Sequence, residues 1–376
     1  MKTKIKNFKN KQGGITLVAL VIMIIILLIL ATISIQALTH TGLFAKAQEA
    51  KEKTKNATEN QAKTLNEYED ELNKYVSGTT QTQKLADKVK VGDYVEYTPD
   101  ELGNESLTTL KTNLNTYSGN SNSTVNPAIK RDDLKWRVLD IQNGQVRLIS
   151  ETPTTSEIEL KGFNGYNNAV KLLDNACNVL YNNSKLANKV QNLKIEDITD
   201  YINEKDYSKF NTEYGSTNFS TSKYYPNILL KEKEQKVNGI EGNKLGMSQQ
   251  DEYIKQTEEK EADELELKYT YWEKEMDESD FTNSKYYELF IKKGENKYKN
   301  YWISSRCLTI NSDFGCYFIR EVENGSLKAD DLCGTSGYQS PLLYAFRPVV
   351  TLNSNVKIDN TNSGDGSTAE QAYAIK

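Results

Sequence analysis

The chain has 376 residues, of which 37% are hydrophobic and 26% charged, enough to bury one sizeable globular core beside an extension. The net charge is −5, yet the first 14 residues hold Lys2, Lys4, Lys6, Lys9 and Lys11 and no acid, so the remainder is more acidic than the whole. An acidic body excludes nucleic acid as an expected partner, because phosphates require a basic face. With one histidine, His40, a histidine-dependent triad or a multi-histidine metal site is also excluded.

An uncharged apolar segment runs from Ile15 to Ile35. As a helix rising about 1.5 Å per residue it spans about 31 Å, which matches the hydrocarbon thickness of a bilayer. The lysines before it favour a cytoplasmic N-terminus, since cytoplasmic flanks carry an excess of lysine and arginine. The sequence therefore predicts a single-pass membrane protein whose C-terminal part lies outside the cell.

Three interpretations of this N-terminal region remain open. A cleaved secretory signal has a shorter apolar region and an A-x-A-like site, which residues 35–38 match only weakly. An uncleaved signal anchor is the second interpretation. The third starts from Gly13-Gly14-Ile15-Thr16, a basic leader that ends in glycine directly before the apolar run. This pattern resembles the prepilin signal of type IV pilins.

The prepilin resemblance implies a processing site between Gly14 and Ile15, with cleavage by a prepilin peptidase and methylation of the new amine on Ile15. Glycine lets the backbone extend into a protease groove without a side-chain clash. Pilins usually carry a glutamate at the fifth position of the mature chain, where this chain has Ala19. That departure leaves assembly into a filament open.

A stalk and a linker follow at residues 36–76 and 77–89. Leu43–Val76 is rich in Ala, Glu, Lys and Gln and contains no Pro or Gly, which predicts a helix. The helix would either pack on the globular head through the stripe Leu65, Tyr68, Leu72 and Tyr75 or serve as a solvated spacer. The small polar residues 77–84 predict a flexible connection.

The predicted head covers residues 90–358. It opens with an alternating strand at 90–97, continues through a polar loop at about 100–130, and reaches a hairpin whose turn is Asn143-Gly144. Asn-Gly favours the two-residue turn in which both central residues have positive φ, and this pairs Ile141 with Val146, Asp140 with Arg147 and Leu139 with Leu148. Because both faces of the hairpin are partly apolar, we expect it in the middle of a sheet.

The rest of the head alternates in character. Residues 165–182 predict an amphipathic helix with Val170, Leu173, Cys177 and Leu180 on one face. Residues 230–300 are charged and indicate a solvated surface rather than a calcium site, because they lack the EF-hand order of ligands. Strands are expected at 301–307, 315–322 and 344–352, with Pro348 favouring an edge or a bulge. The tail 359–376 is polar and glycine-containing, and we expect it to be flexible.

Four cysteines stand at positions 177, 307, 316 and 333. No pair has the C-x-x-C spacing of zinc or redox sites. Cys307 and Cys316 flank a predicted hairpin, which makes them the candidate disulfide of an exported chain, and four thiols are the alternative. Cys177 lies on the apolar helix face and is expected to be a core thiol.

The chain resembles a group of exported clostridial (Firmicutes) proteins of unknown function with prepilin-type N-termini. The stretches that carry this resemblance are Gly14–Ile35, Val91–Val95, Trp136–Leu139, Gly165–Val170, Tyr301–Cys307 and Phe346–Val350. The strand with Trp302 and Arg306, followed by the Arg347-Pro348 strand, is similar to the end of a C-type-lectin-like fold. The expected fold class is therefore α+β: a long N-terminal transmembrane and stalk α-helix, then a mainly antiparallel β head with a few helices, C-type-lectin-like by this resemblance.

The sequence contains no recognisable catalytic motif and predicts a protein that is not an enzyme and uses no cofactor or metal. Arg306, Arg347 and Trp302 are weak candidates for ligand binding, although buried arginines are more often satisfied by core acceptors. The expected function is a pilin-like surface protein at the Gram-positive cell membrane. Its expected partners are the lipid bilayer, a prepilin peptidase and other pilin-like subunits. The alternative is a monomeric anchored module whose head binds cell-wall glycan.

Overall fold

The computed structural model describes residues 83–203, 273–291, 300–310, 315–334 and 338–376. All of them belong to the compact unit Thr82–Lys376. The leader, the apolar segment and the stalk (residues 1–76), and with them the processing site Gly14 and Ile15, lie outside the described residues. So does most of the charged region 230–300. Among the residues that are described, no helix is long and apolar enough to cross a bilayer.

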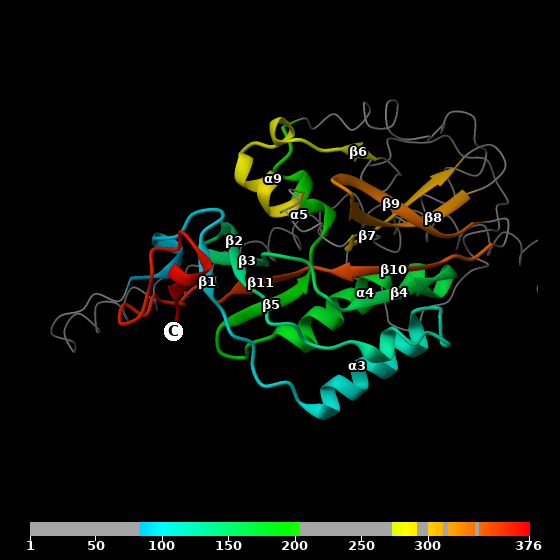
Figure 1. Cartoon of the computed structure of the whole chain (residues 1–376), viewed down its shortest axis with the longest axis horizontal. Helices are drawn as coiled ribbons and strands as arrows, with labels where there is room; N and C mark the ends of the chain where they lie inside the picture. Colours follow the sequence, from blue (N-terminus) through cyan, green and yellow to red (C-terminus); the bar gives the residue numbers. More distant parts are fainter. Residues whose placement is uncertain (1–82, 204–272, 292–299, 311–314, 335–337) are drawn as a thin grey trace, which may run out of the picture. The chain divides into compact units, whose positions relative to one another are not determined.

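The described strands form two six-stranded sheets (Figure 1). In order, the first sheet contains β12 (Tyr373–Ala374), β1 (Tyr94–Glu96), β2 (Trp136–Gln142), β3 (Gln145–Ser150), β11 (Pro348–Leu352) and β5 (Ala187–Asn192). The second contains β4 (Glu157–Lys161), β10 (Pro341–Phe346), β7 (Tyr301–Ile310), β8 (Gly315–Glu323), β9 (Ser326–Gly334) and β6 (Lys274–Glu275). Each sheet is mixed, since β1 runs parallel to β12 and β10 runs parallel to β7.

The described helices lie on both sides of these sheets, as Figure 1 shows. On one side α4 (Gly162–Tyr181) and α3 (Asn104–Tyr117) contribute to a large hydrophobic core, here called the α4 core. On the other side α5 (Ile195–Thr199) and α9 (Ser284–Phe290) contribute to a second core, the α9 core. Short 3₁₀ turns complete the described elements: η1 (Leu85–Asp87), η2 (Asn126–Ala128), η5 (Glu278–Asp280) and η6 (Ala369–Gln371).

The predicted fold class is wrong. The described residues form twelve strands in two mixed sheets with helices on both sides; most strand pairs are antiparallel, but β1–β12 and β10–β7 are parallel, and no long apolar helix is found among these residues. Sequence periodicity reveals where a strand lies but not the direction of its neighbour, because the parallel partners β1 and β12 are almost 280 positions apart in the chain. The expected long N-terminal helix falls on residues outside the described part.

The β2–β3 hairpin confirms the turn prediction. Asn143 and Gly144 both have positive φ, 52° and 74°, as a two-residue Asn-Gly turn requires. Ile141 pairs with Val146 and Asp140 with Arg147, whereas Leu148 lies opposite Val138 because the register shifts between Val138 and Asp140. Val138 enters the α4 core and Leu139 the α9 core, as adjacent strand residues on opposite faces do, and the hairpin is central as expected.

Helix α4 confirms the predicted amphipathic helix but is buried on more than one face. The expected stripe is fully buried, and so are Tyr166, Ala169 and Leu172 outside it. Helix α3 covers part of α4 and buries Leu110 and Leu114, in a segment expected to be a loop. The leucines at 107, 110 and 114 have helical spacing, a signal hidden by the polar residues between them.

The predicted closing strand at 344–352 is two strands in different sheets. β10 belongs to the second sheet and β11 to the first, and Arg347 lies at the crossing between them. Pro348 begins β11, a position where its missing N–H costs no ladder bond. The chain can change sheets here because side chains replace the ladder: Thr154 accepts from Phe346 N and donates to its carbonyl oxygen, and Asn192 accepts from Arg347 N.

The C-terminal residues 359–376 are ordered rather than flexible. They contain η6 and β12, and Tyr373 and Ala374 are buried. Backbone bonds from Gly364 N to Ala372 O (3.0 Å) and from Asp359 N to Ala374 O (2.8 Å) fold the segment onto itself. Polar composition predicted mobility, but pairing with β1 supplies the partners that this composition cannot reveal.

Candidate functional site

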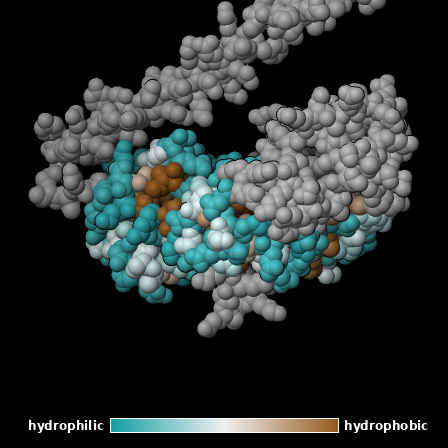
Figure 2. All heavy atoms as spheres, turned by 90° about the horizontal axis from the view of Figure 1, so that it is seen from above, coloured by the Kyte–Doolittle hydropathy of each residue, from teal (hydrophilic) through white to brown (hydrophobic). Residues whose placement is uncertain are grey.

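Three hollows in the described part are large enough to take a ligand. Two neighbouring hollows of about 350 and 340 Å³ share Tyr97, Thr98, Asp133, Leu134 and Trp136 in their walls. We call this pair the β1 groove, because β1 and the chain just after it form one side. A third hollow of about 420 Å³, the C-terminal pocket, lies beside residues 183–186. Elsewhere the face seen in Figure 2 is largely hydrophilic, with a few hydrophobic patches.

Local pairing fixes the position of β1 in the groove. Tyr94 lies opposite Arg137 and Val95 opposite Trp136. The Arg137 guanidinium lies over the Tyr94 ring at 5.0 Å and donates from Nε to the Gly92 carbonyl oxygen at 2.9 Å. Gly92 has φ +88°, and a Cβ there would stand 3.0 Å from the Arg137 side chain. Glycine at this position therefore allows the turn that leads into β1.

Aromatic rings form the floor of the β1 groove. The rings of Tyr97 and Trp136 meet edge to face at 5.1 Å, and those of Trp136 and Tyr181 at 5.8 Å. The Tyr97 hydroxyl donates to the Tyr181 carbonyl oxygen at 2.7 Å, and burial raises the pKa of Tyr97. All three rings are at most 4% exposed. They support the groove from below and offer no open face on which a sugar could stack.

The polar rim of the β1 groove is mostly acidic. Asp132 is already engaged, since its carboxylate accepts from the backbone N–H and the hydroxyl of Thr155. Arg131 donates from Nη2 to the Asp100 carbonyl oxygen at 2.7 Å. The exposed charged side chains on the rim are Glu96, Asp133, Lys135 and Glu370, and the exposed uncharged ones are Thr98 and Asn362. This rim can hydrogen-bond uncharged or cationic groups and repels anionic ones.

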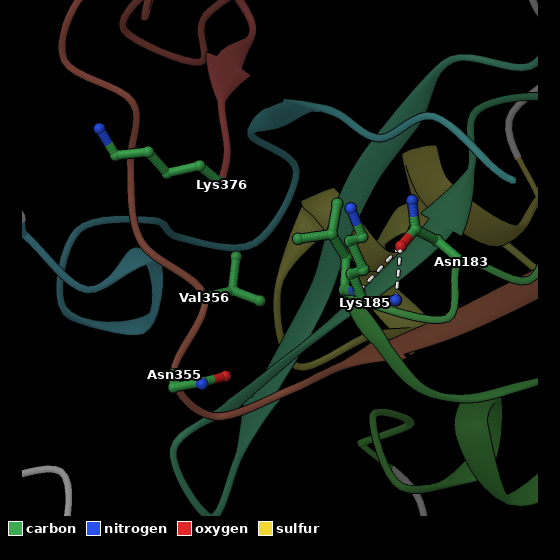
Figure 3. Close-up of a pocket in the computed structure, with 6 residues that line it drawn as sticks. Asn183, Lys185, Asn355, Val356 and Lys376 are labelled. Carbon is green, nitrogen blue, oxygen red and sulfur yellow. Dashed lines mark hydrogen bonds between the residues drawn. The ribbon is translucent and has the colours of Figure 1, made fainter.

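The C-terminal pocket is more basic and is shown in Figure 3. Asn183 builds its wall: the side-chain oxygen accepts from the backbone N–H groups of Lys185 (3.0 Å) and Leu186 (2.9 Å), while Nδ2 donates to the Thr98 carbonyl oxygen. Lys376 lies across the pocket from Lys185 and pairs with Asp359 at 3.3 Å. Asn183 thus joins the pocket to the β1 groove through Thr98.

The three predicted ligand-binding residues are buried in the core. Arg347 is 1% exposed and donates to the carbonyl oxygens of Ser150 (2.9 and 3.1 Å) and Glu151 (2.8 Å), and also to the Tyr301 hydroxyl. Arg306 is fully buried over the Tyr166 ring at 4.9 Å. Trp302 is fully buried and donates from Nε1 to the Ile158 carbonyl oxygen at 2.9 Å. The geometry gives Arg347 and Trp302 structural roles, the alternative that the sequence also allowed.

The candidate disulfide is not formed. The four cysteines, all among the described residues, are buried thiols. Cys307 lies opposite Phe318 on β7 and β8, while Cys316 lies opposite Thr309. The two cysteines are therefore diagonal neighbours two positions apart, and such neighbours are separated by about 7–8 Å, beyond the reach of a disulfide. Cys177 is a core thiol, and burial raises its pKa.

Sequence reasoning missed a buried carboxyl group on β8. Glu321 is fully buried next to Lys328, whose Nζ lies 3.8 Å from its Oε1. Burial raises the pKa of Glu321 to about 9, with the charge of Asp330 adding to this effect and Lys328 opposing it. The Tyr344 hydroxyl donates to Asp330. The sequence did contain a signal for this burial. Glu321 lies two residues after Ile319 in the predicted strand and therefore on the same, inward face.

No metal site emerges from these groups. Within the described ranges, no set of three or more His, Cys, Asp or Glu side chains is placed so that it could hold an ion. Glu321 has the raised pKa typical of a catalytic acid, but it is closed off from solvent. The β1 groove therefore remains the best candidate site for a ligand.

Comparison with known proteins adds no assignment: no family model, no curated protein and no solved structure matches this chain.

Proposed function

We propose that this chain is a pilin-like surface protein of a Gram-positive cell, which a prepilin peptidase processes and which its apolar N-terminal segment anchors in the membrane. One observation carries the proposal: a lysine-rich leader ends in Gly13-Gly14, and the uncharged run Ile15–Ile35 follows at once. The lysines stay in the cytoplasm and the apolar run stays in the lipid. Residues 36–376 therefore lie outside the cell.

The compact unit supports this proposal. Residues 82–376 cluster separately from residues 1–81, and the described part contains two hydrophobic cores of its own. A unit with its own cores can be displayed at the end of a tether without help from the segment that precedes it. The acidic balance after the leader suits a surface in contact with water rather than with nucleic acid.

The test is the mass and sequence of the mature N-terminus in a cell that expresses a prepilin peptidase. We expect a chain that starts at N-methylated Ile15. Gly14→Leu should leave the leader attached, whereas the matched Gly13→Ala variant should be processed normally. An intact Met1 in the wild-type chain, or a cut beyond Ile35, contradicts the proposal.

The same preparation also tests whether the chain assembles into filaments. Ala19 stands where pilins carry the glutamate that neutralises a neighbouring N-terminus, so we expect few or no filaments of this chain alone by electron microscopy. Ala19→Glu restores the acidic group and should raise the yield of filaments that contain the chain. Abundant filaments of the wild-type chain would remove the argument from Ala19.

The second candidate function is an anchored binding module for cell-wall glycan, in which the rim of the β1 groove would bind by hydrogen bonds, since its buried rings offer no stacking face. Its rim of Glu96, Asp133 and Glu370 suits neutral or amine-bearing sugars and disfavours anionic wall polymers. A glycan array with residues 82–376 tests this function, with Asp133→Asn and the remote, exposed Ile141→Ser as the matched pair. Equal signals from both variants, or binding of anionic polymers alone, contradict it.

A further inference from the structure

The last residues of the chain contribute to two separate features. We call residues 369–376, which contain η6 and β12, the strap. On one side the strap pairs with residues 357–359, whose backbone also bonds to Gln83–Leu85. On the other side it forms a wall of the β1 groove. Both contacts involve backbone hydrogen bonds or strand pairing, so they depend on the position of the strap and hardly on its side chains.

The first contact is a three-stranded ladder that we call the junction. Gln83–Leu85 pairs with Val356–Ile358 through Leu85 N to Val356 O (3.0 Å) and Ile358 N to Gln83 O (2.9 Å). On the opposite side of 356–358, Lys357 and Lys376 exchange two bonds of 3.1 and 3.0 Å, and Ile358 bridges Ile375. The backbone of 356–358 therefore lies between Gln83–Leu85 and the strap.

The second contact is the parallel pair of β12 and β1, in which Val95 lies opposite Tyr373 and Glu96 opposite Ala374. Glu370 and Ala372 of the strap line the β1 groove together with Glu96 of β1. The groove thus loses one wall if the strap moves. In the first sheet the strap is the edge strand, and its side away from β1 bonds to the backbone of residues 357–359.

Close packing ties the strap to the loop before it. Ala374 N donates to the Ser363 hydroxyl at 3.2 Å. At Gly364 an added Cβ would stand 2.1 Å from the Gln371 carbonyl oxygen, and at Gly366 it would stand 2.4 Å from the Tyr373 ring. Gly366 in turn accepts from Tyr94 N at 2.8 Å. The strap, the loop and β1 therefore fit together backbone against backbone.

We propose that the strap couples the junction to the β1 groove: the same opening of residues 369–376 frees the ladder that holds Gln83–Leu85 and removes a wall of the groove. Strain applied to the chain at Gln83 would then reach the groove through Lys357 and Lys376. The coupling is a property of residues 83–376, so it holds whether or not the leader is cleaved. A failure of the coupling would therefore leave the surface-protein proposal standing, and a failure of that proposal would leave the coupling standing.

Hydrogen exchange on the full chain tests the coupling, because amide protection reports the free energy of local opening. Ser363→Ala removes the acceptor of Ala374 N, and the loss of one such bond should speed strap opening about fivefold. Coupling predicts the same factor at Leu85 and Ile358 of the junction and at Tyr94–Glu96 of β1. Ile375→Ala, which trims a partly buried side chain of the strap, should speed the same amides further.

Ser367→Ala is the matched control, because its hydroxyl bonds only within its own turn, to Asp365. It should leave the junction and β1 at wild-type rates. The proposal is overturned if Ser363→Ala and Ile375→Ala speed exchange at Lys357 and Lys376 while Leu85 or the β1 amides keep their wild-type rates. In that case the strap opens alone and neither feature depends on it.

Discussion

Arg347 and Glu321 are both buried charged residues of the described sheets, yet the protein accommodates them in opposite ways. Arg347 lies where the chain crosses from β10 to β11, and backbone carbonyl oxygens of Ser150 and Glu151 surround its guanidinium. Glu321 lies in mid-strand on β8, and neither of its oxygens accepts a hydrogen bond from the described residues. Hydrogen bonds satisfy the charge of Arg347, whereas burial raises the pKa of Glu321 and so favours its neutral form.

The contrast follows from the neighbouring backbone. Strand ends and crossings leave carbonyl groups that no ladder uses, and a planar guanidinium can bond several of them at once. In mid-strand the carbonyl and N–H groups are already paired, so a carboxylate finds no donors and its neutral form is favoured. The free-energy cost of burying a charged side chain is thus small at a break in a sheet and large in the middle of a strand.

Arg347→Met should give the largest effect and tests the first half of this comparison. It leaves the carbonyl oxygens of Ser150 and Glu151 buried without donors, and we expect a loss of about 3–5 kcal/mol in the free energy of unfolding. Urea titration followed by circular dichroism measures it. Arg137→Met, at a partly exposed site with one backbone acceptor, is the control and should cost about 1 kcal/mol. Equal losses would remove the special role of the crossing.

Glu321→Gln tests the second half. Because the folded-state pKa of Glu321 is raised to about 9, the folded chain keeps a proton that the unfolded chain releases above its ordinary value of 4.5. The stability contributed by this group is complete below about pH 4.5 and falls as the pH rises towards 9, by at most about 1.4 kcal/mol per pH unit.

The glutamine variant lacks this titrating carboxyl group, so its free energy of unfolding should vary less between pH 5 and 9. At pH 8 that free energy should exceed the wild-type value. The measurement is a series of urea titrations across that range. The control is Glu323→Gln at the partly exposed neighbouring position, which should keep most of the wild-type slope. A wild-type slope in Glu321→Gln would show that other groups cause the pH dependence.

Trp302→Phe should give a smaller effect and sharpens the comparison with a neutral buried donor. The indole N–H bonds the Ile158 carbonyl oxygen at 2.9 Å, and its loss leaves one buried acceptor unpaired. We expect about 1–2 kcal/mol of destabilisation by thermal unfolding. Tyr344→Phe is the comparison: it keeps the edge-to-face contact of 4.5 Å with Trp302 and the indole bond, and removes only the hydroxyl that donates to Asp330.

The elements that the sequence predicted well are those in which neighbours along the chain carry the signal. Asn143-Gly144 selects its turn because both residues tolerate positive φ, and this alone aligns Ile141 with Val146. The apolar stripe of α4 likewise repeats within the helix itself. Local chemistry suffices when both partners of a contact lie within a few residues.

The missed features depend on partners far away in the chain. Residues 344–352 read as one strand, and only the positions of β4 and β3 divide them between two sheets at Arg347. The tail 359–376 looks flexible until β1 pairs with Tyr373 and Ala374. The β1 groove was not anticipated at all, since its walls come from residues near 96, 133 and 370.

The sequence by itself determined the charged leader, the apolar run from Ile15 to Ile35, the Asn-Gly hairpin and the helix predicted at 165–182, because each is fixed by composition or by spacing within one segment. Tertiary structure alone decided the mixed pairing of the two sheets, the burial of Arg306, Arg347 and Glu321, and the ordering of the strap. The physical reason is that backbone groups must find partners wherever the fold brings them. A strand's own residues do not specify which distant segment supplies those partners.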